Sequence, residues 1–141
     1  MSFDVDRVLK KAYAVRSLEE ICRALELSDA QQELAHANML SERIVQLGGE
    51  PDFSPGGLAA RSHAEYVAGV TLIDMIREDL VAERIAIDSY RGFIQYLGDK
   101  DPTTRGLLET ILAVEEQHAD ELADLLQDAS GLAAKTRAVL A

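Results

Sequence analysis

Apolar residues recur every three or four positions along most of the chain, which is the spacing of an amphipathic α-helix. The clearest apolar seam predicts a helix over about residues 65–97. Its members are Ile73, Ile76, Leu80, Glu83, Ile87, Tyr90, Ile94 and Leu97. Glu83 is the one charged side chain in this otherwise apolar stripe.

Two further seams have the same period. One predicts a helix over about residues 103–128, after the helix-start signal Asp101-Pro102-Thr103. It consists of Leu108, Ile111, Glu115, His118, Leu122 and Leu125. The other runs from about residue 29 to 47 and stops at Gly48-Gly49. It carries Glu33, His36, Leu40, Ile44 and Leu47 on one face.

The remaining segments complete an all-α plan. The pattern over residues 5–27 predicts a first helix. The sequence Ser28-Asp29-Ala30-Gln31 has the form of a capping box, which predicts a turn at residue 28. The prolines and glycines between residues 48 and 64 indicate one long crossover. We therefore expect residues 1–141 to form one domain, a four-helix bundle, with room for a short amphipathic helix over residues 132–141.

The composition supports an all-α fold and limits the classes of binding partner. The 141 residues include no Trp, only 5% aromatic residues and a single cysteine, Cys22, which excludes a disulfide framework and a paired-cysteine metal site. The net charge of −11 disfavours nucleic acid as a partner and is compatible with metal cations. No stretch approaches the ~20 apolar residues of a membrane span, and the N-terminus lacks signal-peptide character, so we expect a cytoplasmic protein.

Two of the three histidines follow a glutamate by three positions, in Glu33-Leu34-Ala35-His36 and in Glu115-Glu116-Gln117-His118. Residues i and i+3 of a helix lie one turn apart on the same face, so a carboxylate oxygen and an imidazole nitrogen can bind one metal ion. Both pairs fall on predicted apolar seams. This placement favours a metal site over a chance pairing.

The seams would bury three carboxylates, those of Glu33, Glu83 and Glu115. A buried carboxylate must be protonated, paired with a cation or bound to metal. For any one residue the simpler alternative is a hydrogen-bonded histidine or a glutamate paired with an arginine such as Arg43 or Arg84. The recurrence of the pattern on three helices favours metal.

From Glu33 onward the chain resembles bacterioferritin, of the ferritin-like di-iron superfamily. The resemblance covers about residues 30–128. Its motifs are Glu33-Leu34-Ala35-His36-Ala37, Ser41-Glu42-Arg43-Ile44 and Leu47-Gly48-Gly49-Glu50-Pro51 for the second helix and its exit, Asp79-Leu80-Val81-Ala82-Glu83 for the third, and Glu115-Glu116-Gln117-His118 for the fourth.

This resemblance implies a ferritin-like bundle with a di-iron site. Glu33 and Glu115 would bridge the two irons, His36 and His118 would each bind one, and Glu83 would be a terminal ligand. The implied activity is a ferroxidase that oxidises Fe(II) to Fe(III) with dioxygen or peroxide, for iron storage or detoxification, with the three glutamates as the catalytic residues. A homo-oligomer is implied, and it also agrees with apolar residues outside the seams, namely Leu72, Val81, Leu107 and Leu126.

The chain departs from the family in two places. The family's first helix supplies a fourth glutamate, for which the only candidates here are Glu26, Glu19 and Glu20, and none is assigned. Three glutamates leave about one positive charge of two Fe(II) uncompensated, which predicts weaker binding at one of the two metal positions. Leu34 stands where the family's haem-binding methionine is expected, so haem is not predicted.

Other functions remain open. A di-iron peroxide scavenger or oxidase would use the same five ligands. A helical structural protein with an incomplete site would hold the same residues in a buried polar network without metal. A DNA-sheltering small ferritin is disfavoured by the acidic charge and by the lack of a basic tail.

Overall fold

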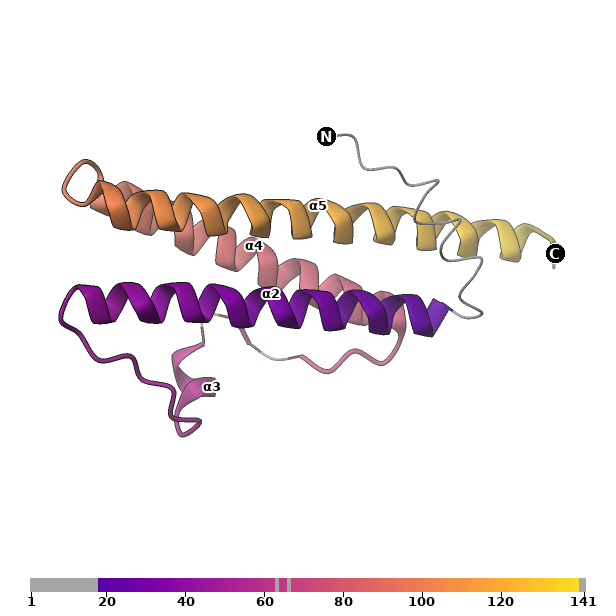
Figure 1. Ribbon diagram of the computed structural model, residues 1–141. Helices are drawn as coiled ribbons and strands as arrows, with labels where there is room; N and C mark the ends of the chain where they lie inside the picture. The colour runs from indigo at the N-terminus through magenta and orange to yellow at the C-terminus, as the bar shows by residue number, and fades with distance from the viewer. Residues whose placement is uncertain (1–17, 63, 66, 140–141) are drawn as a thin grey trace. The chain divides into compact units, whose positions relative to one another are not determined.

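The computed structural model describes residues 18–62, 64–65 and 67–139, with the side chains of residues 18–27, 58–59 and 129–139 left out of the description. These residues form helices and no strand (Figure 1). The helices are α2 (Leu18–Gln46), α3 (Leu58–Arg61), α4 (Leu72–Leu97) and α5 (Pro102–Val139). The all-α prediction is confirmed. The chain forms two compact units, of which the first ends at Glu50 and contains α2, and the second begins at Pro51 and contains α3, α4 and α5.

Helix α2 is continuous through residue 28, so the predicted turn at Ser28–Gln31 is wrong. The Ser28 hydroxyl accepts a hydrogen bond from the Gln32 side chain, 3.5 Å away and one turn further along the same helix. The neighbouring Ala, Leu, Gln and Glu residues are strong helix formers, and they sustain the helix across a local cap signal. The part of the predicted first helix before Leu18 lies outside the described residues.

The end of α2 matches the predicted glycine stop. Gly48 has a φ of 81°, which is a left-handed conformation that favours glycine. The Gly48 N–H donates to the carbonyl of Val45 and the Gly49 N–H to that of Ile44, both at 2.9 Å. This pattern is a Schellman motif, which satisfies the last carbonyls of the helix.

Helix α4 begins at Leu72, seven residues later than predicted, because a capping box fixes its start. The Thr71 hydroxyl accepts a hydrogen bond from the Asp74 N–H, and the Asp74 carboxylate accepts one from the Thr71 N–H, each at 3.2 Å. Hydrogen bonds from Thr71 hold the pKa of the Asp74 carboxyl below its ordinary value of 3.8. The connection from α2 therefore extends to residue 71.

Within that connection, the Asp52 side chain holds a short turn together. Its carboxylate accepts a hydrogen bond from the Ser54 N–H at 2.9 Å and forms an ion pair with Arg61 at the end of α3. The Ser54 N–H and the Arg61 guanidinium both lower the pKa of the Asp52 carboxyl.

Helix α5 begins at Pro102, where the Asp101 carboxylate accepts hydrogen bonds from the N–H and the hydroxyl of Thr104. It continues without a break to Val139, so residues 132–139 of the separate helix predicted over residues 132–141 are the end of α5 instead. Residues 140 and 141 lie outside the described residues. No proline interrupts this alanine- and leucine-rich segment.

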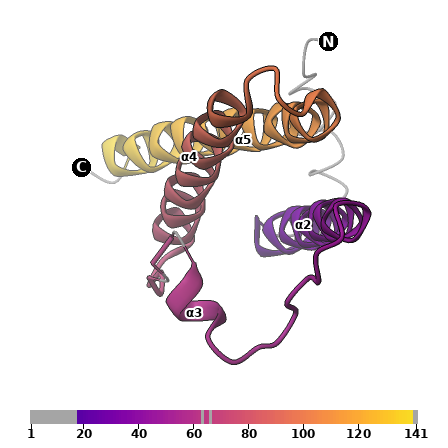
Figure 2. The same cartoon turned by 90° about the vertical axis from the view of Figure 1, so that its left-hand side faces the viewer.

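Helices α4 and α5 lie side by side and are joined by the short turn at residues 98–101 (Figures 1 and 2). Leu80, Ile87 and Ala119 form the buried centre of their contact. Packed against this centre are Leu112, Leu122, Ala123 and Leu126. Leu126, predicted on an outer face, is thus part of the core, while Val81 is exposed as predicted. On α4 the predicted seam supplies Leu80 and Ile87 to this contact, and on α5 the predicted seam supplies Leu122. Leu108 and Ile111 of the α5 seam are buried as predicted.

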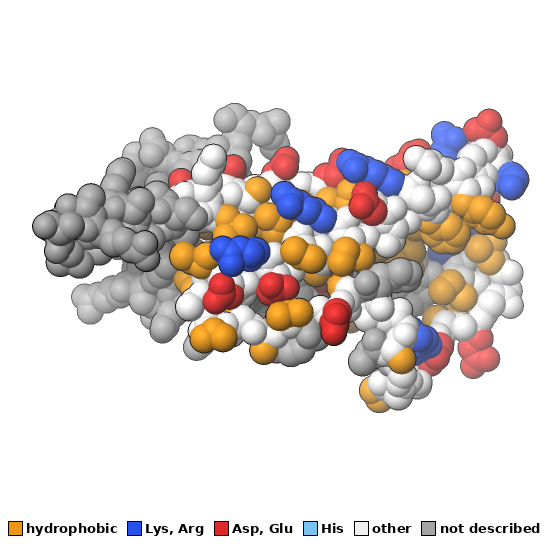
Figure 3. All heavy atoms as spheres, turned by 180° about the vertical axis from the view of Figure 1, so that it is seen from behind, with side chains coloured by type: hydrophobic (Ala, Val, Ile, Leu, Met, Phe, Trp, Pro, Cys, Tyr) orange, Lys and Arg blue, Asp and Glu red, His pale blue; other side chains and the backbone are white. Residues whose placement is uncertain are grey.

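The outer surface mixes residue types. Figure 3 shows apolar side chains running between acidic and basic ones on one face. One cross-helix ion pair, between Arg91 of α4 and Glu116 of α5, adds to the apolar contact. Within the described part of the chain, no helix is sufficiently long and apolar for a membrane span.

Candidate metal centre

Three of the five predicted ligands converge between α4 and α5. His118 Nδ1 lies 3.6 Å from Glu83 Oε1 and 3.6 Å from Glu115 Oε2. Each of the three residues offers one ligand atom, and these atoms lie within 4.8 Å of one another. Among the described residues of the second unit, no other Asp, Glu, His or Cys joins them. We call Glu83, Glu115 and His118 the hairpin triad.

The apolar seams position the hairpin triad. Glu83 lies one turn from Leu80 and from Ile87 on α4, and His118 is followed by the core residue Ala119 on α5. The hairpin therefore brings Glu83 towards α5 by the same periodicity that buries its apolar neighbours. Glu115 and His118 are 1% and 4% exposed, and the Glu83 side chain is 17% exposed.

The spacing of the hairpin triad suits a bound cation. Nitrogen and oxygen ligands lie ~2.0–2.2 Å from a transition-metal ion, so two donors of one ion are about 3–3.6 Å apart, depending on the angle between them. The two 3.6 Å separations fall at the upper end of this range. Two hard carboxylates and one imidazole form a donor set suited to iron, manganese or zinc.

The other two predicted ligands lie together on α2, in the first unit. His36 Nδ1 is 3.7 Å from Glu33 Oε1, as expected for residues one turn apart. The Glu33 side chain is 54% exposed, so the prediction of three buried carboxylates is wrong for this residue. A glutamate on an apolar seam near a helix middle can still extend its carboxylate into solvent, because its three-bond side chain reaches past the seam.

The candidates for a fourth carboxylate also fall on α2. Glu26 precedes Glu33 by seven residues of one unbroken helix, which is about 10 Å along the axis at ~1.5 Å per residue, and Glu19 and Glu20 precede it by about 20 Å. The side chains of these three residues lie outside the described part of the chain, so the fourth carboxylate is not assigned.

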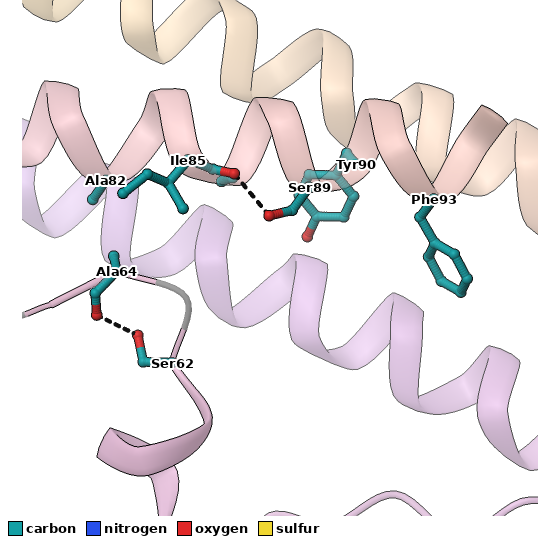
Figure 4. Close-up of a pocket in the computed structure, with 8 residues that line it drawn as sticks. Ser62, Ala64, Ala82, Ile85, Ser89, Tyr90 and Phe93 are labelled. Atoms are coloured by element: carbon teal, nitrogen blue, oxygen red, sulfur yellow. Dashed lines mark hydrogen bonds between the residues drawn. The ribbon is translucent and has the colours of Figure 1, made fainter. Parts of the chain in front are cut away.

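A separate hollow of ≈570 Å³ lies on another face of α4 (Figure 4). It is lined by Ser62, Ala64, Ala82, Ile85, Ala86, Ser89, Tyr90 and Phe93. The Ser89 hydroxyl donates to the Ile85 carbonyl at 2.8 Å, and the Ser62 hydroxyl to the Ala64 carbonyl at 2.7 Å. Because this lining contains no carboxylate, imidazole or thiol, the hollow is not a metal site.

The sequence did not predict the ion pair between Arg91 and Glu116, the residue that follows Glu115. The two residues are 25 positions apart, and neither lies on an apolar seam. The one signal in the sequence is the glutamate doublet itself. Residues 115 and 116 point in directions about 100° apart on a helix, so only one of them can face the seam.

The structure places this chain among helical proteins that hold carboxylates and a histidine together between two helices. The chain belongs to the ferritin family, whose ferritin-like domain matches residues 22–132.

Individual relatives agree with this assignment. The chain is 33% identical over 96 residues to a bacterioferritin of Streptomyces coelicolor, covering 67% of this chain and 53% of that protein. It is 29% identical over 101 residues to the bacterioferritin BfrA of Mycobacterium tuberculosis, covering 71% and 59%. The chain thus spans about half the length of the curated relatives it matches.

A solved structure of similar fold is that of the bacterioferritin-related protein of Bacteroides fragilis, which is described as a dodecameric thioferritin. The TM-score is 0.78 at 25% sequence identity, and the match covers 84% of this chain and 72% of that one. The predicted ferritin-like fold is confirmed by this similarity.

Proposed function

We propose that this protein binds iron and oxidises Fe(II) to Fe(III) at a dinuclear centre made by Glu33, His36, Glu83, Glu115 and His118. The observation that carries the proposal is the hairpin triad, in which two carboxylates and an imidazole converge at 3.6 Å in a largely buried place. The His36 and Glu33 pair on α2 supplies the second half of the donor set. Membership of the ferritin family supports iron as the metal.

In this centre Glu33 and Glu115 would each bind both irons, His36 and His118 would each bind one, and Glu83 would be a terminal ligand. Anionic oxygen ligands stabilise the ferric state, and the neutral imidazoles hold the ferrous ion. Each Fe(II) gives up one electron. The two electrons, with two protons, reduce one dioxygen to hydrogen peroxide, so the reaction balances without a further reductant.

The proposed role is iron storage or detoxification in a cytoplasmic homo-oligomer. The dodecamer described for the Bacteroides fragilis protein supports assembly. Exposed apolar side chains on α4 agree with it, since Val81, Phe93 and Tyr96 are 45%, 49% and 72% exposed. A peroxide scavenger or oxidase would use the same ligands and would differ in the oxidant that reacts fastest.

The test is aerobic oxidation of Fe(II), followed by the ferric absorbance, in the wild-type chain and in Glu115→Gln. The substitution keeps the shape of the side chain and removes the charge that the metal needs. We expect saturable oxidation in the wild type and a rate at least about tenfold lower in the variant. Glu42→Gln is the control, because it neutralises an exposed glutamate of α2 and should retain the wild-type rate.

An equal rate in Glu115→Gln and the wild type would refute the proposed centre. If iron analysis of the wild type also finds no bound metal after incubation with Fe(II), the hairpin triad is a buried polar network and the protein is a helical structural protein. If the wild type does oxidise Fe(II), a comparison of dioxygen with hydrogen peroxide under nitrogen distinguishes a ferroxidase from a peroxide scavenger. A scavenger oxidises Fe(II) faster with peroxide.

A further inference from the structure

Helix α4 carries a second apolar stripe, apart from the seam that packs on α5. Ala82, Ile85, Ser89 and Phe93 lie along it at steps of three or four residues and line the hollow of ≈570 Å³ (Figure 4). Tyr96 continues the stripe by one further turn. Phe93 and Tyr96 are 49% and 72% exposed, and their rings stack with centroids 6.4 Å apart. An exposed aromatic pair beside an apolar hollow is typical of an interaction surface, and we call these five residues the outer stripe.

The outer stripe has the same spacing in both directions from Ser89. Ile85 and Phe93 each lie four residues from Ser89, and Ala82 and Tyr96 each lie seven. Steps of four and seven residues return to the same side of an α-helix. Two copies of α4 that cross antiparallel at Ser89 therefore bring Phe93 of each copy against Ile85 of the other, and Tyr96 against Ala82. Each contact joins an aromatic ring to a smaller side chain, so the stripe complements itself in size.

The charges beyond the outer stripe have the same symmetry. Glu78 and Lys100 each lie eleven residues from Ser89, on opposite sides. Lys100 follows the end of α4, and its Nζ lies over the Tyr96 ring, 5.2 Å from the centroid, on the side of the outer stripe. Within the described residues, neither Glu78 nor Lys100 forms an ion pair. In the antiparallel arrangement the Glu78 carboxylate of each copy meets the Lys100 ammonium of the other.

Gly92 gives a further reason to expect a close helix contact here. A helix interior disfavours glycine relative to alanine. The space that a Cβ would fill at Gly92 is open, with no atom within 4 Å, so packing among the described residues does not require glycine there. Gly92 and Ala86 each lie three residues from Ser89 and would face each other between the two copies. Small side chains at the crossing let two helix axes approach closely.

We infer that the outer stripe of α4 binds the outer stripe of a second copy of this chain, antiparallel and about a twofold axis at Ser89. Such a contact is isologous, since the same patch on both copies is used and every contact away from the axis occurs twice. A second copy is the partner because the stripe complements itself in size and in charge. The inference specifies one face of the proposed homo-oligomer and does not depend on the proposed metal chemistry.

Cross-linking at the twofold axis tests this contact. In the full chain, with the natural cysteine removed by Cys22→Ser, the substitution Ser89→Cys places two thiols at the axis. A disulfide needs Cβ atoms ~3.5–4.5 Å apart, which only a close crossing at this residue provides. Oxidation with diamide, which accepts two electrons and two protons from the thiols, should give mostly a covalent dimer on denaturing electrophoresis. Gln95→Cys, at an exposed position on another side of α4, is the matched control and should stay mostly uncoupled.

Charge exchange gives a second readout that leaves the apolar contact unchanged. Glu78→Lys and Lys100→Glu should each weaken self-association at least about fivefold in analytical ultracentrifugation, because each replaces two ion pairs by two like-charge contacts. The double variant restores both pairs with their signs reversed and should return to within about twofold of the wild type. Glu42→Lys, which makes the same change of net charge on α2, is the control and should associate like the wild type.

Circular dichroism identifies any variant that has lost its helical fold. The inference is overturned if the wild type is a monomer, if Ser89→Cys cross-links no better than Gln95→Cys, or if the double charge variant associates as weakly as the single ones. An oligomer that persists without a cross-link at residue 89 assembles through another face, which also overturns it. Fe(II) oxidation by the wild type is measured separately, so the proposed function can fail or stand whichever of these results is found.

Discussion

At the scale of single residues, Ile111 shows how the apolar core supports the candidate centre. Its side chain is 0% exposed and lies one turn before Glu115 on the same face of α5. Shortening it would leave a cavity beside the hairpin triad. Ile111→Ala should lower the free energy of unfolding by about 2–5 kcal/mol.

Urea denaturation followed by circular dichroism measures this loss. Val81→Ala is the control, because Val81 is 45% exposed and its truncation should cost less than about 0.5 kcal/mol. A loss at Ile111 as small as that at Val81 would contradict the packing described for α5.

The single residues also show what periodicity can and cannot predict. Glu83, Glu115 and His118 stand out in the sequence because they are polar members of apolar seams, and the structure brings these three together. Glu33 stands on a seam in the same way, yet its side chain is 54% exposed. Periodicity fixes the direction of the Cα–Cβ bond, whereas the side-chain torsions that place a carboxylate depend on the surroundings.

At the scale of the helices, the ends of α4 and α5 depend on side-chain caps. Thr71 and Asp74 form a reciprocal cap at the start of α4. Replacing Thr71 by alanine removes the hydroxyl that accepts a hydrogen bond from the Asp74 N–H. It also removes the hydrogen bond that this hydroxyl donates to the Asp74 carboxylate. Thr71→Ala should destabilise the protein by about 0.5–2 kcal/mol in thermal or urea unfolding.

The same cap should make stability depend on pH. Hydrogen bonds from Thr71 lower the pKa of Asp74 in the folded protein below its ordinary value of 3.8. A depressed carboxyl pKa contributes stability above the unfolded value, and that contribution is lost as the pH falls through the folded value. The stability difference between the wild type and Asp74→Asn should therefore be constant near neutral pH and shrink below about pH 4.

Unfolding of both proteins in urea at a series of pH values measures this change. Glu78→Gln, which alters another carboxylate in the first turns of α4, controls for general acid effects. A difference between wild type and Asp74→Asn that stays the same down to the lowest pH at which both fold would contradict the depressed pKa.

The helix boundaries show where local signals mislead. The box at Ser28–Gln31 has the right residue types for a cap, but a cap forms only where the preceding chain leaves the helix, and the segment before residue 28 is helical from Leu18 onward. At the start of α4 the cap signal was the correct one. The apolar spacing predicted a helix from about residue 65, whereas the capping box of Thr71 and Asp74 starts the helix at Leu72. Choosing between such signals requires knowledge of tertiary contacts.

At the scale of the whole molecule, the charge of −11 should influence how Fe(II) reaches the proposed centre. A net negative field raises the local concentration of cations, and salt screens it over a Debye length of ~10 Å at 0.1 M. Initial rates of Fe(II) oxidation at low Fe(II) should fall as NaCl rises from about 0.02 M to 0.5 M. The maximal rate at saturating Fe(II) should change much less.

Stopped-flow measurement at several Fe(II) concentrations separates the two effects. A maximal rate that falls in parallel with the low-iron rate would show that salt acts on the centre itself and would contradict long-range attraction. The Glu115→Gln variant provides the background rate at each salt concentration.

The glutamate doublet at residues 115 and 116 has a consequence for the rotational setting of α5. One glutamate belongs to the hairpin triad and its neighbour binds Arg91 across the hairpin. A turn of the helix by one residue would bring the wrong carboxylate inward and would break the ion pair at the same time. The exposed ion pair therefore indicates whether α5 has assembled with Glu115 facing the seam. Exchanging Arg91 and Glu116 for each other preserves the pair, whereas changing either residue alone removes it.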